Sequence, residues 1–231
     1  MKHVVIIGAS SGIGNALAQR LLKSGVELTV FSRRRPEIES EHIAYFPYDV
    51  LSDADQLPVS DRVVDGFVYM PGNIRLKPFK SLKDDEFLED WKINFLGAVK
   101  TFRHFLPQLL KSTSASALFF STVAGTIGMP FHSSIAAAKS AVEGLTRSLA
   151  AEFAPKIRIN CIAPSLTKTP LSEYLTNNEQ KLIASIDRHP LKRIGQPDDV
   201  AAFAEFLLSD KAEFITGQVI RMDGGISTVK I

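Results

Sequence analysis

Short apolar runs alternate with longer segments of helical periodicity along the whole chain of 231 residues. Continuous apolar runs are typical of strands buried on both faces, and apolar residues three and four positions apart are typical of amphipathic helices. The pattern predicts seven strands, at Val4–Ile7, Glu27–Phe31, Ile43–Phe46, Val63–Tyr69, Ala117–Phe120, Ile157–Ile162 and Gln218–Arg221. It predicts one helix through Ile13, Leu17, Leu21 and Leu22, and others over Asp84–Leu110, Ser134–Phe153 and Asp198–Leu208.

Alternation of strands and helices at this spacing predicts βαβ units. The expected fold class is α/β, a Rossmann-type doubly wound parallel sheet of about seven strands with helices on both faces. Because no linker, repeat or low-complexity block interrupts the pattern, residues 1–231 are expected to form a single domain. Residues 165–197 are polar and weakly patterned. Since ligands of open α/β sheets lie beyond the carboxyl ends of the strands, we expect a substrate lid here.

Composition narrows the function classes. A net charge of +2 and 45% hydrophobic residues are ordinary for a globular domain. The low net charge argues against a nucleic-acid-binding surface. A lone cysteine, Cys161, excludes an internal disulfide and a cysteine-based zinc site. No apolar run approaches the ~20 residues needed to cross a bilayer. We therefore expect a cytoplasmic protein without a metal, a membrane or a nucleic-acid partner.

The glycine-rich segment between the first strand and the first helix carries the strongest motif. Glycines allow a tight turn and close approach of the backbone to a pyrophosphate, and the following helix N-terminus offers unpaired N–H groups. Its position after a β-branched run and before an amphipathic helix is the context that such a motif requires. The sequence therefore predicts a dinucleotide site at Gly8, Ser10, Ser11, Gly12, Ile13 and Gly14.

The end of the second strand distinguishes the two dinucleotides. A carboxylate there holds the ribose 2′-hydroxyl of NAD, but this chain has Ser32, Arg33 and Arg34. Guanidinium groups match phosphate oxygens with paired, charge-assisted hydrogen bonds. The prediction is NADP (NADPH) rather than NAD.

With these motifs the chain resembles the short-chain dehydrogenase/reductase family over nearly its whole length. The resemblance also rests on Asn94, on the segment Ile157–Pro164 followed by Thr169, and on Asp223-Gly224-Gly225. It implies that Asp49 and Val50 contact adenine and that Pro71 and Gly72 form a turn beside the cofactor. It also implies that the nicotinamide end is held by Pro164, Ser165, Thr167 and Thr169. Ser165 replaces the usual glycine of the family, and Met70 replaces the usual asparagine.

The chemistry of that family needs a tyrosine four residues before a lysine, and a hydroxyl about thirteen residues before the tyrosine. The lysine position is Lys139, and the resemblance implies that it also binds the nicotinamide ribose. The hydroxyl position falls on Thr122, with Ser121 beside it, and the tyrosine position is Ile135. Because isoleucine has no proton to give, the usual proton donor is missing.

Three candidates are able to replace it. His132 lies seven residues before Lys139, close to two helical turns, and shares its face if the helix reaches that far back. Ser133 or Ser134 offers a relay through water, although a helix N-cap is the simpler role. Lys139 is itself a proton donor.

The expected function is an NADP(H)-dependent oxidoreductase of short-chain dehydrogenase/reductase type that exchanges hydride with a carbonyl, an alcohol or an activated double bond. Asn94 is expected to organise a water near Lys139, and Thr122 or Ser121 to polarise a small-molecule substrate. The alternative is a catalytically silent NADP-binding sensor or subunit. The resemblance and the small-residue helix faces imply a homo-oligomer, a dimer or tetramer.

Overall fold

The sheet of the protein is parallel throughout, in the computed structural model that describes residues 1–52, 57–58 and 61–230. Its strand order is β3-β2-β1-β4-β5-β6-β7. The strands are β1 (His3–Ile7), β2 (Glu27–Ser32), β3 (Ile43–Pro47), β4 (Gly66–Tyr69), β5 (Ala115–Phe120), β6 (Ile157–Pro164) and β7 (Val219–Met222). The direction of winding reverses between β1 and β4, which is where such folds bind their ligands. The predicted fold class is confirmed.

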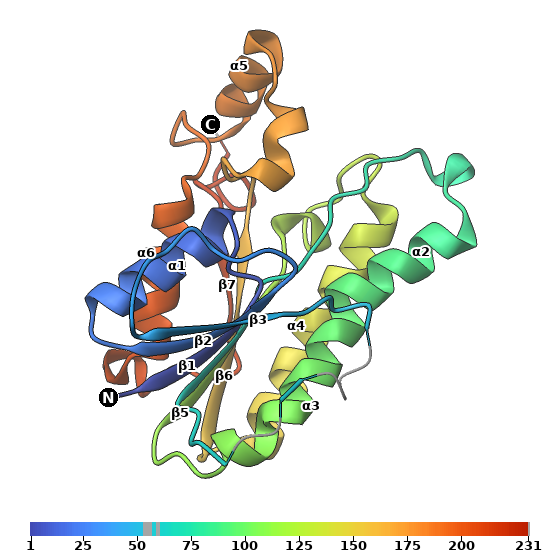
Figure 1. The fold of residues 1–231 in the computed structure, drawn as a ribbon. Helices are drawn as coiled ribbons and strands as arrows, with labels where there is room; N and C mark the ends of the chain where they lie inside the picture. Colours follow the sequence, from blue (N-terminus) through green and yellow to red (C-terminus); the bar gives the residue numbers. More distant parts are fainter. Residues whose placement is uncertain (53–56, 59–60, 231) are drawn as a thin grey trace.

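Two layers of helices enclose this sheet (Figure 1). One face is covered by α1 (Gly12–Lys23) and α6 (Pro197–Leu208). The other is covered by α3 (Gly97–Leu109) and α4 (Ser133–Phe153), with α2 (Asp84–Trp91) packed against α4. The remaining α-helix, α5 (Glu179–Arg188), projects beyond the carboxyl ends of the strands. It lies inside the stretch 165–197, whose pattern had predicted no helix.

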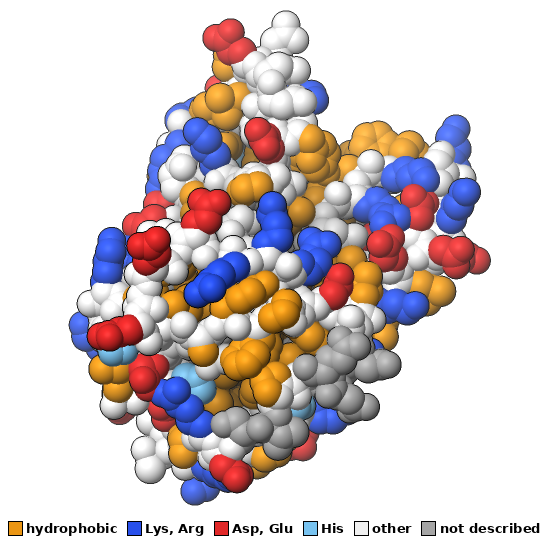
Figure 2. Space-filling model, in the orientation of Figure 1, with side chains coloured by type: hydrophobic (Ala, Val, Ile, Leu, Met, Phe, Trp, Pro, Cys, Tyr) orange, Lys and Arg blue, Asp and Glu red, His pale blue; other side chains and the backbone are white. Residues whose placement is uncertain are grey.

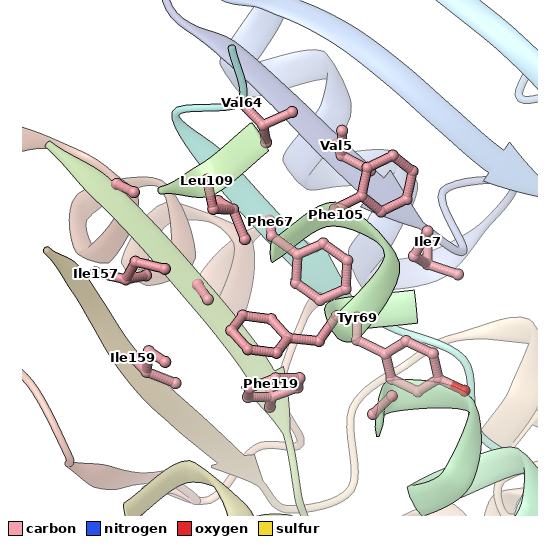
Figure 3. Close-up of a cluster of buried hydrophobic side chains, with 14 of the residues drawn as sticks. Val5, Ile7, Val64, Phe67, Tyr69, Phe105, Leu109, Phe119, Ile157 and Ile159 are labelled. Atoms are coloured by element: carbon pink, nitrogen blue, oxygen red, sulfur yellow. The ribbon is translucent and has the colours of Figure 1, made fainter. Parts of the chain in front are cut away.

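The core between the sheet and α3 is rich in phenylalanine. Phe67 on β4 and Phe119 on β5 are fully buried and meet edge-on, and Phe105 of α3 packs against Phe67 (Figure 3). Edge-to-face aromatic pairs add roughly 0.5–1.5 kcal/mol beyond their buried area. This packing fixes the directions in which β4 and β5 deliver the residues that follow them.

The helical segment predicted over Asp84–Leu110 is confirmed, but it is not uniform, because a π-helical turn, η3 (Lys92–Leu96), joins α2 to α3. Two side chains take over backbone acceptors at this point. The hydroxyl of Tyr69 donates to the carbonyl of Ile93 (2.5 Å), and Asn94 Nδ2 donates to the carbonyl of Asp90 (2.8 Å). Such turns are frequent at functional sites.

Smaller differences concern element ends. The fourth strand begins at Gly66 rather than Val63, because the N–H of Val64 is bound by the carbonyl of Gln108 instead of a neighbouring strand. Short 3₁₀ helices fill the connections, at Phe79–Ser81 (η2), Val123–Gly125 (η4), Pro170–Leu175 (η5) and Asp210–Ala212 (η6). In the described part of the chain, no helix is both long and apolar enough to span a membrane.

Candidate functional site

The glycine-rich turn between β1 and α1 has a backbone that requires glycine. Gly8 and Gly12 have φ of 89° and 57°, a region that other residues rarely adopt. A Cβ atom on Gly14 would lie 2.2 Å from the carbonyl oxygen of Gly8. The turn is therefore folded tightly, with α1 packed against the strand that precedes it.

The start of α1 is free to bind an anion. Its N-cap, Ser11, makes no side-chain capping hydrogen bond, and the first turn contains no acidic residue. Gly12 is covered by Thr169, since a Cβ on Gly12 would lie 3.1 Å from the Thr169 methyl carbon. The N–H groups at this helix N-terminus have no capping side chain, and a threonine from the segment after β6 packs over them. This arrangement is suited to bind a pyrophosphate. Ser10, Ser11 and Ile13 lie in the same turn.

The carboxyl ends of β2 and β3 lie side by side, since Ser32 pairs with Pro47. Arg33 and Arg34 are exposed directly after β2. Ser32 is buried, and its hydroxyl donates to the carbonyl of Arg34 (2.7 Å), so it shapes the loop that presents the two guanidinium groups. Asp49 and Val50 follow β3, where the Asp49 carboxylate accepts from the Leu51 N–H (3.0 Å).

Three predicted residues meet beyond the end of β4. A Cβ atom on Gly72 would lie 3.0 Å from Asn94 Oδ1 and 3.3 Å from Lys139 Nζ. The same turn reaches the glycine-rich segment, because a Cβ on Gly8 would lie 3.1 Å from the Pro71 ring. Residues from β1, β4, η3 and α4 are thus brought together at one edge of the sheet.

Lys139 is a buried cation, 8% exposed. Its ammonium donates to the carbonyl of Phe120 (2.9 Å) at the end of β5. Burial lowers the pKa of Lys139 to about 8, because a low-dielectric surrounding disfavours the charged form. The nearby Cys161 thiol, whose pKa burial raises to about 12, does not neutralise it. Lys139 is therefore poised to exchange a proton near neutral pH.

Ile135 lies one helical turn before Lys139 and is 4% exposed, so it forms part of the wall. The two hydroxyl candidates differ. Ser121 is buried and its hydroxyl contacts Glu143 Oε1 (2.6 Å), which directs it into α4. Thr122 is partly exposed and accepts from the Ala124 N–H (3.3 Å), which leaves its hydrogen without an acceptor among the described residues. Thr122 is the hydroxyl available to a ligand.

The start of α4 separates the other proton candidates. The helix begins at Ser133, so the condition for His132 to share a face with Lys139 is not met: His132 is the N-cap, and its Nδ1 bonds the Pro130 carbonyl (2.7 Å). Ser133 is exposed. Ser134 is buried and its hydroxyl donates to Asp90 (2.5 Å). Neither serine makes a described contact with Lys139.

The segment after β6 carries the nicotinamide-end candidates. Pro164 ends the strand, Thr167 forms a bridge with Gly195, and Thr169 is tied to Ser172. The hydroxyl of Ser165 bonds Nε2 of His189 (2.9 Å), a histidine that is 2% exposed at the end of α5. This contact ties the end of α5 to the residue that directly follows β6.

Sequence reasoning missed the polar residues behind Asn94. Asn73 Oδ1 accepts from Asn94 Nδ2 (2.6 Å), and Asp90 is completely buried beside them. A signal was present, because Asp90 is four residues before Asn94 and hence on the same face of a helix. His189 carried no comparable signal.

Comparisons with known proteins identify the family. A family model described as enoyl-(acyl carrier protein) reductase matches residues 8–227. The 3-oxoacyl-(acyl-carrier-protein) reductase FabG of Staphylococcus aureus (strain Mu50) is 30% identical over 243 residues, which cover 97% of this chain and 98% of that protein.

Two solved structures are also similar to this chain over nearly its whole length. Ligand-free aldohexose dehydrogenase of Thermoplasma acidophilum has a TM-score of 0.91 at 29% identity, covering 99% of this chain and 95% of that one. ElxO with NADP bound has a TM-score of 0.89 at 28% identity, covering 99% of both chains. The fold, the glycine-rich turn and the match over most of the length lead to one conclusion: the chain belongs to the short-chain dehydrogenase/reductase family.

Proposed function

We propose that the protein is an NADP(H)-dependent oxidoreductase that exchanges hydride with a carbonyl or alcohol substrate and uses Lys139 as its proton donor. The observation that carries the proposal is the buried Lys139 ammonium, whose pKa of about 8 suits proton transfer near neutral pH. It lies beside Gly72 and Asn94, at the edge of the sheet that holds the glycine-rich turn.

The cofactor site follows from the backbone and the exposed arginines. The N–H groups at the start of α1 bind the pyrophosphate, with Gly8 and Gly12 allowing its close approach. Arg33 and Arg34 bind the 2′-phosphate, and Asp49 and Val50 border the adenine. The segment from Pro164 to Thr169 holds the nicotinamide end. When bound, NADPH supplies the hydride.

Reduction of a carbonyl adds a hydride to its carbon and a proton to its oxygen. Thr122 donates to that oxygen and polarises it, because its hydroxyl hydrogen is free. Lys139 supplies the proton, either directly or through a water that donates to Asn94 Oδ1, a buried acceptor without a partner among the described residues. In the oxidation direction the neutral amine of Lys139 accepts the proton.

The stretch 165–197 closes over the substrate. Figure 2 shows a notch between the projection that carries α5 and the arm that carries α2. Tyr174 of η5 contacts the segment after β4, where its hydroxyl donates to the carbonyl of Ile74 (3.2 Å).

A second function, cofactor binding without turnover, is favoured by the buried Ile135. In that case Lys139 serves only to bind the ribose.

One experiment separates the two functions. Purified protein is mixed with NADPH and a panel of ketones, aldehydes and activated alkenes, and the loss of NADPH absorbance is followed. We expect turnover that falls by roughly 10²–10⁴-fold in Lys139→Ala. Lys139→Arg keeps a positive charge but holds its proton too tightly to give it up, so it should retain NADPH binding with little turnover. NADPH binding without turnover on any substrate would establish the silent alternative.

A further inference from the structure

A chain of polar side chains leads from α2 to the space beside Lys139. Asn73 Nδ2 donates to Asp90 Oδ1 (2.5 Å), and Asn94 Nδ2 donates to Asn73 Oδ1 (2.6 Å). Asn94 Nδ2 also donates to the backbone carbonyl of Asp90 (2.8 Å). The chain ends at Asn94 Oδ1, which is buried and has no hydrogen-bond partner among the described residues.

Asp90 fixes the direction of this chain. Its side chain is fully buried, and three donors surround it: the Asn73 amide, the Ser134 hydroxyl (2.5 Å) and Arg75 Nε (3.3 Å). An ionised carboxylate accepts hydrogen bonds and donates none. Asn73 must therefore turn its NH₂ group toward Asp90, because the opposite orientation would place its oxygen against the carboxylate.

The orientation of Asn73 then reinforces that of Asn94, whose NH₂ group also donates to the backbone carbonyl of Asp90 (2.8 Å). Because the NH₂ group of Asn73 donates to Asp90, the Asn73 oxygen faces Asn94. The NH₂ group of Asn94 donates to that oxygen. Asn94 is left with its oxygen free. That oxygen and the Lys139 ammonium border the same point, at 3.0 and 3.3 Å from where a Gly72 side chain would begin. An oxygen at this place stabilises the ammonium, whereas an NH₂ group would repel it.

We propose that Asp90 is a positioning residue, which acts through Asn73 to set the Asn94 amide with its oxygen toward Lys139. The proposal deepens, and rests on, the proposed function, in which Lys139 must carry a proton that it can give up. Asp90 itself touches neither cofactor nor substrate.

The other charged groups near the two ends of the chain have different partners. Arg75, which contacts Asp90, is also held by Glu86 (3.1 Å) and Glu89 (2.5 Å). On the Lys139 side, Cys161 on β6 stays a neutral thiol, since burial raises its pKa to about 12, and Glu143 on α4 accepts from Ser121. Asp90 is therefore the charge that is coupled to Asn94 through oriented amides.

The test measures the pKa of Lys139 by NMR titration of lysine methylene carbons in the protein without cofactor or substrate, with Lys139→Arg to assign the signal. Asp90→Asn has the same shape but is able to donate, so it no longer fixes Asn73. We expect the pKa of Lys139 to fall by about one unit. Glu89→Gln removes the same charge from an exposed partner of Arg75 and should shift it by less than about 0.3 unit.

A rescue separates this positioning role from loss of structure. Asn73→Asp in the Asp90→Asn background moves the carboxylate one step along the chain and again forces Asn94 to present its NH₂ group to residue 73, so the pKa of Lys139 should recover. Asn73→Ala breaks the relay and should lower it even if Asp90→Asn does not fold. Equal shifts in Asp90→Asn and Glu89→Gln, or no recovery in the double variant, would overturn the proposal. This readout needs no turnover, so a protein inactive on every carbonyl would refute the proposed function while the pKa values still decide the relay.

Discussion

The β1–α1 turn and the start of α4 face the same edge of the sheet but constrain their residues in different ways. In the turn, the backbone itself excludes other residues: Gly8 and Gly12 have positive φ, and Gly14 leaves no room for a Cβ. At position 135 the backbone is an ordinary α-helix, which accepts isoleucine as readily as tyrosine. A cofactor cradle is therefore a property of the backbone, whereas a proton donor is a property of one side chain. A single substitution is able to change the second without disturbing the first.

The largest effect is expected when a proton-donating side chain is placed at position 135. Ile135→Tyr places a phenol one turn before Lys139, where the ammonium favours the phenolate. We expect carbonyl reduction to rise by up to roughly 10²–10⁴-fold, the range of general acid catalysis, less what Lys139 already contributes as the donor. The measurement is kcat/KM for the carbonyl panel with NADPH.

Ile135→Phe is the matched control, because it adds the ring without the hydroxyl. Both variants risk overpacking of about 1–3 kcal/mol, so melting temperatures accompany the kinetics. If tyrosine and phenylalanine give the same rates in folded, NADPH-binding protein, the site lacks more than an acid.

On the cofactor side, Arg33→Ala should weaken NADPH far more than NADH. The guanidinium follows β2 in an exposed position, and charge-assisted hydrogen bonds of about 1.5–3 kcal/mol correspond to roughly 10–100-fold in affinity. Fluorescence titration of both dinucleotides measures the difference. Arg35→Ala removes an equal charge from a side chain that lies over the Tyr45 ring (6.0 Å) and serves as control. Equal affinities of the wild type for NADPH and NADH would contradict the predicted preference.

The same contrast explains what the sequence allowed us to predict. Glycines, β-branched runs and the spacing of apolar residues indicate backbone conformation and burial. The sheet and the glycine-rich turn could therefore be predicted from the sequence. The π turn at η3 could not be predicted, because it involves the Tyr69 hydroxyl, which donates to the carbonyl of Ile93 from a distant part of the chain. The choice among His132, Ser134 and Lys139 could not be predicted either, because it depends on the hydrogen-bond partners of each group and on how deeply the group is buried.

A moderate effect is expected from pH. The pKa of Lys139 is lowered to about 8 by burial, so its ammonium is lost as pH rises through that value. Reduction should therefore fall about tenfold per unit above pH 8, and oxidation of the corresponding alcohol should show the opposite trend. Because the unfolded chain holds this proton up to about 10.5, the same group makes folding more favourable as pH rises from 8 to 10.5. A reduction rate that is flat across pH 8 would exclude Lys139 as the donor.

The smallest effect compares two phenol hydroxyls, one on each side of the site. Tyr174 donates to the carbonyl of Ile74 (3.2 Å) and ties η5 to the segment after β4, whereas Tyr45 donates to the carbonyl of Ser32 (3.1 Å) near the arginines. Each hydrogen bond contributes roughly 0.5–1.5 kcal/mol, a factor of about 2–10. Tyr174→Phe should raise KM for the carbonyl by that factor and leave the NADPH dissociation constant unchanged. Tyr45→Phe should weaken NADPH slightly and leave the carbonyl KM alone. If both variants change the same constant, residues 165–197 do not form a lid over a separate substrate site, and the two regions act as one.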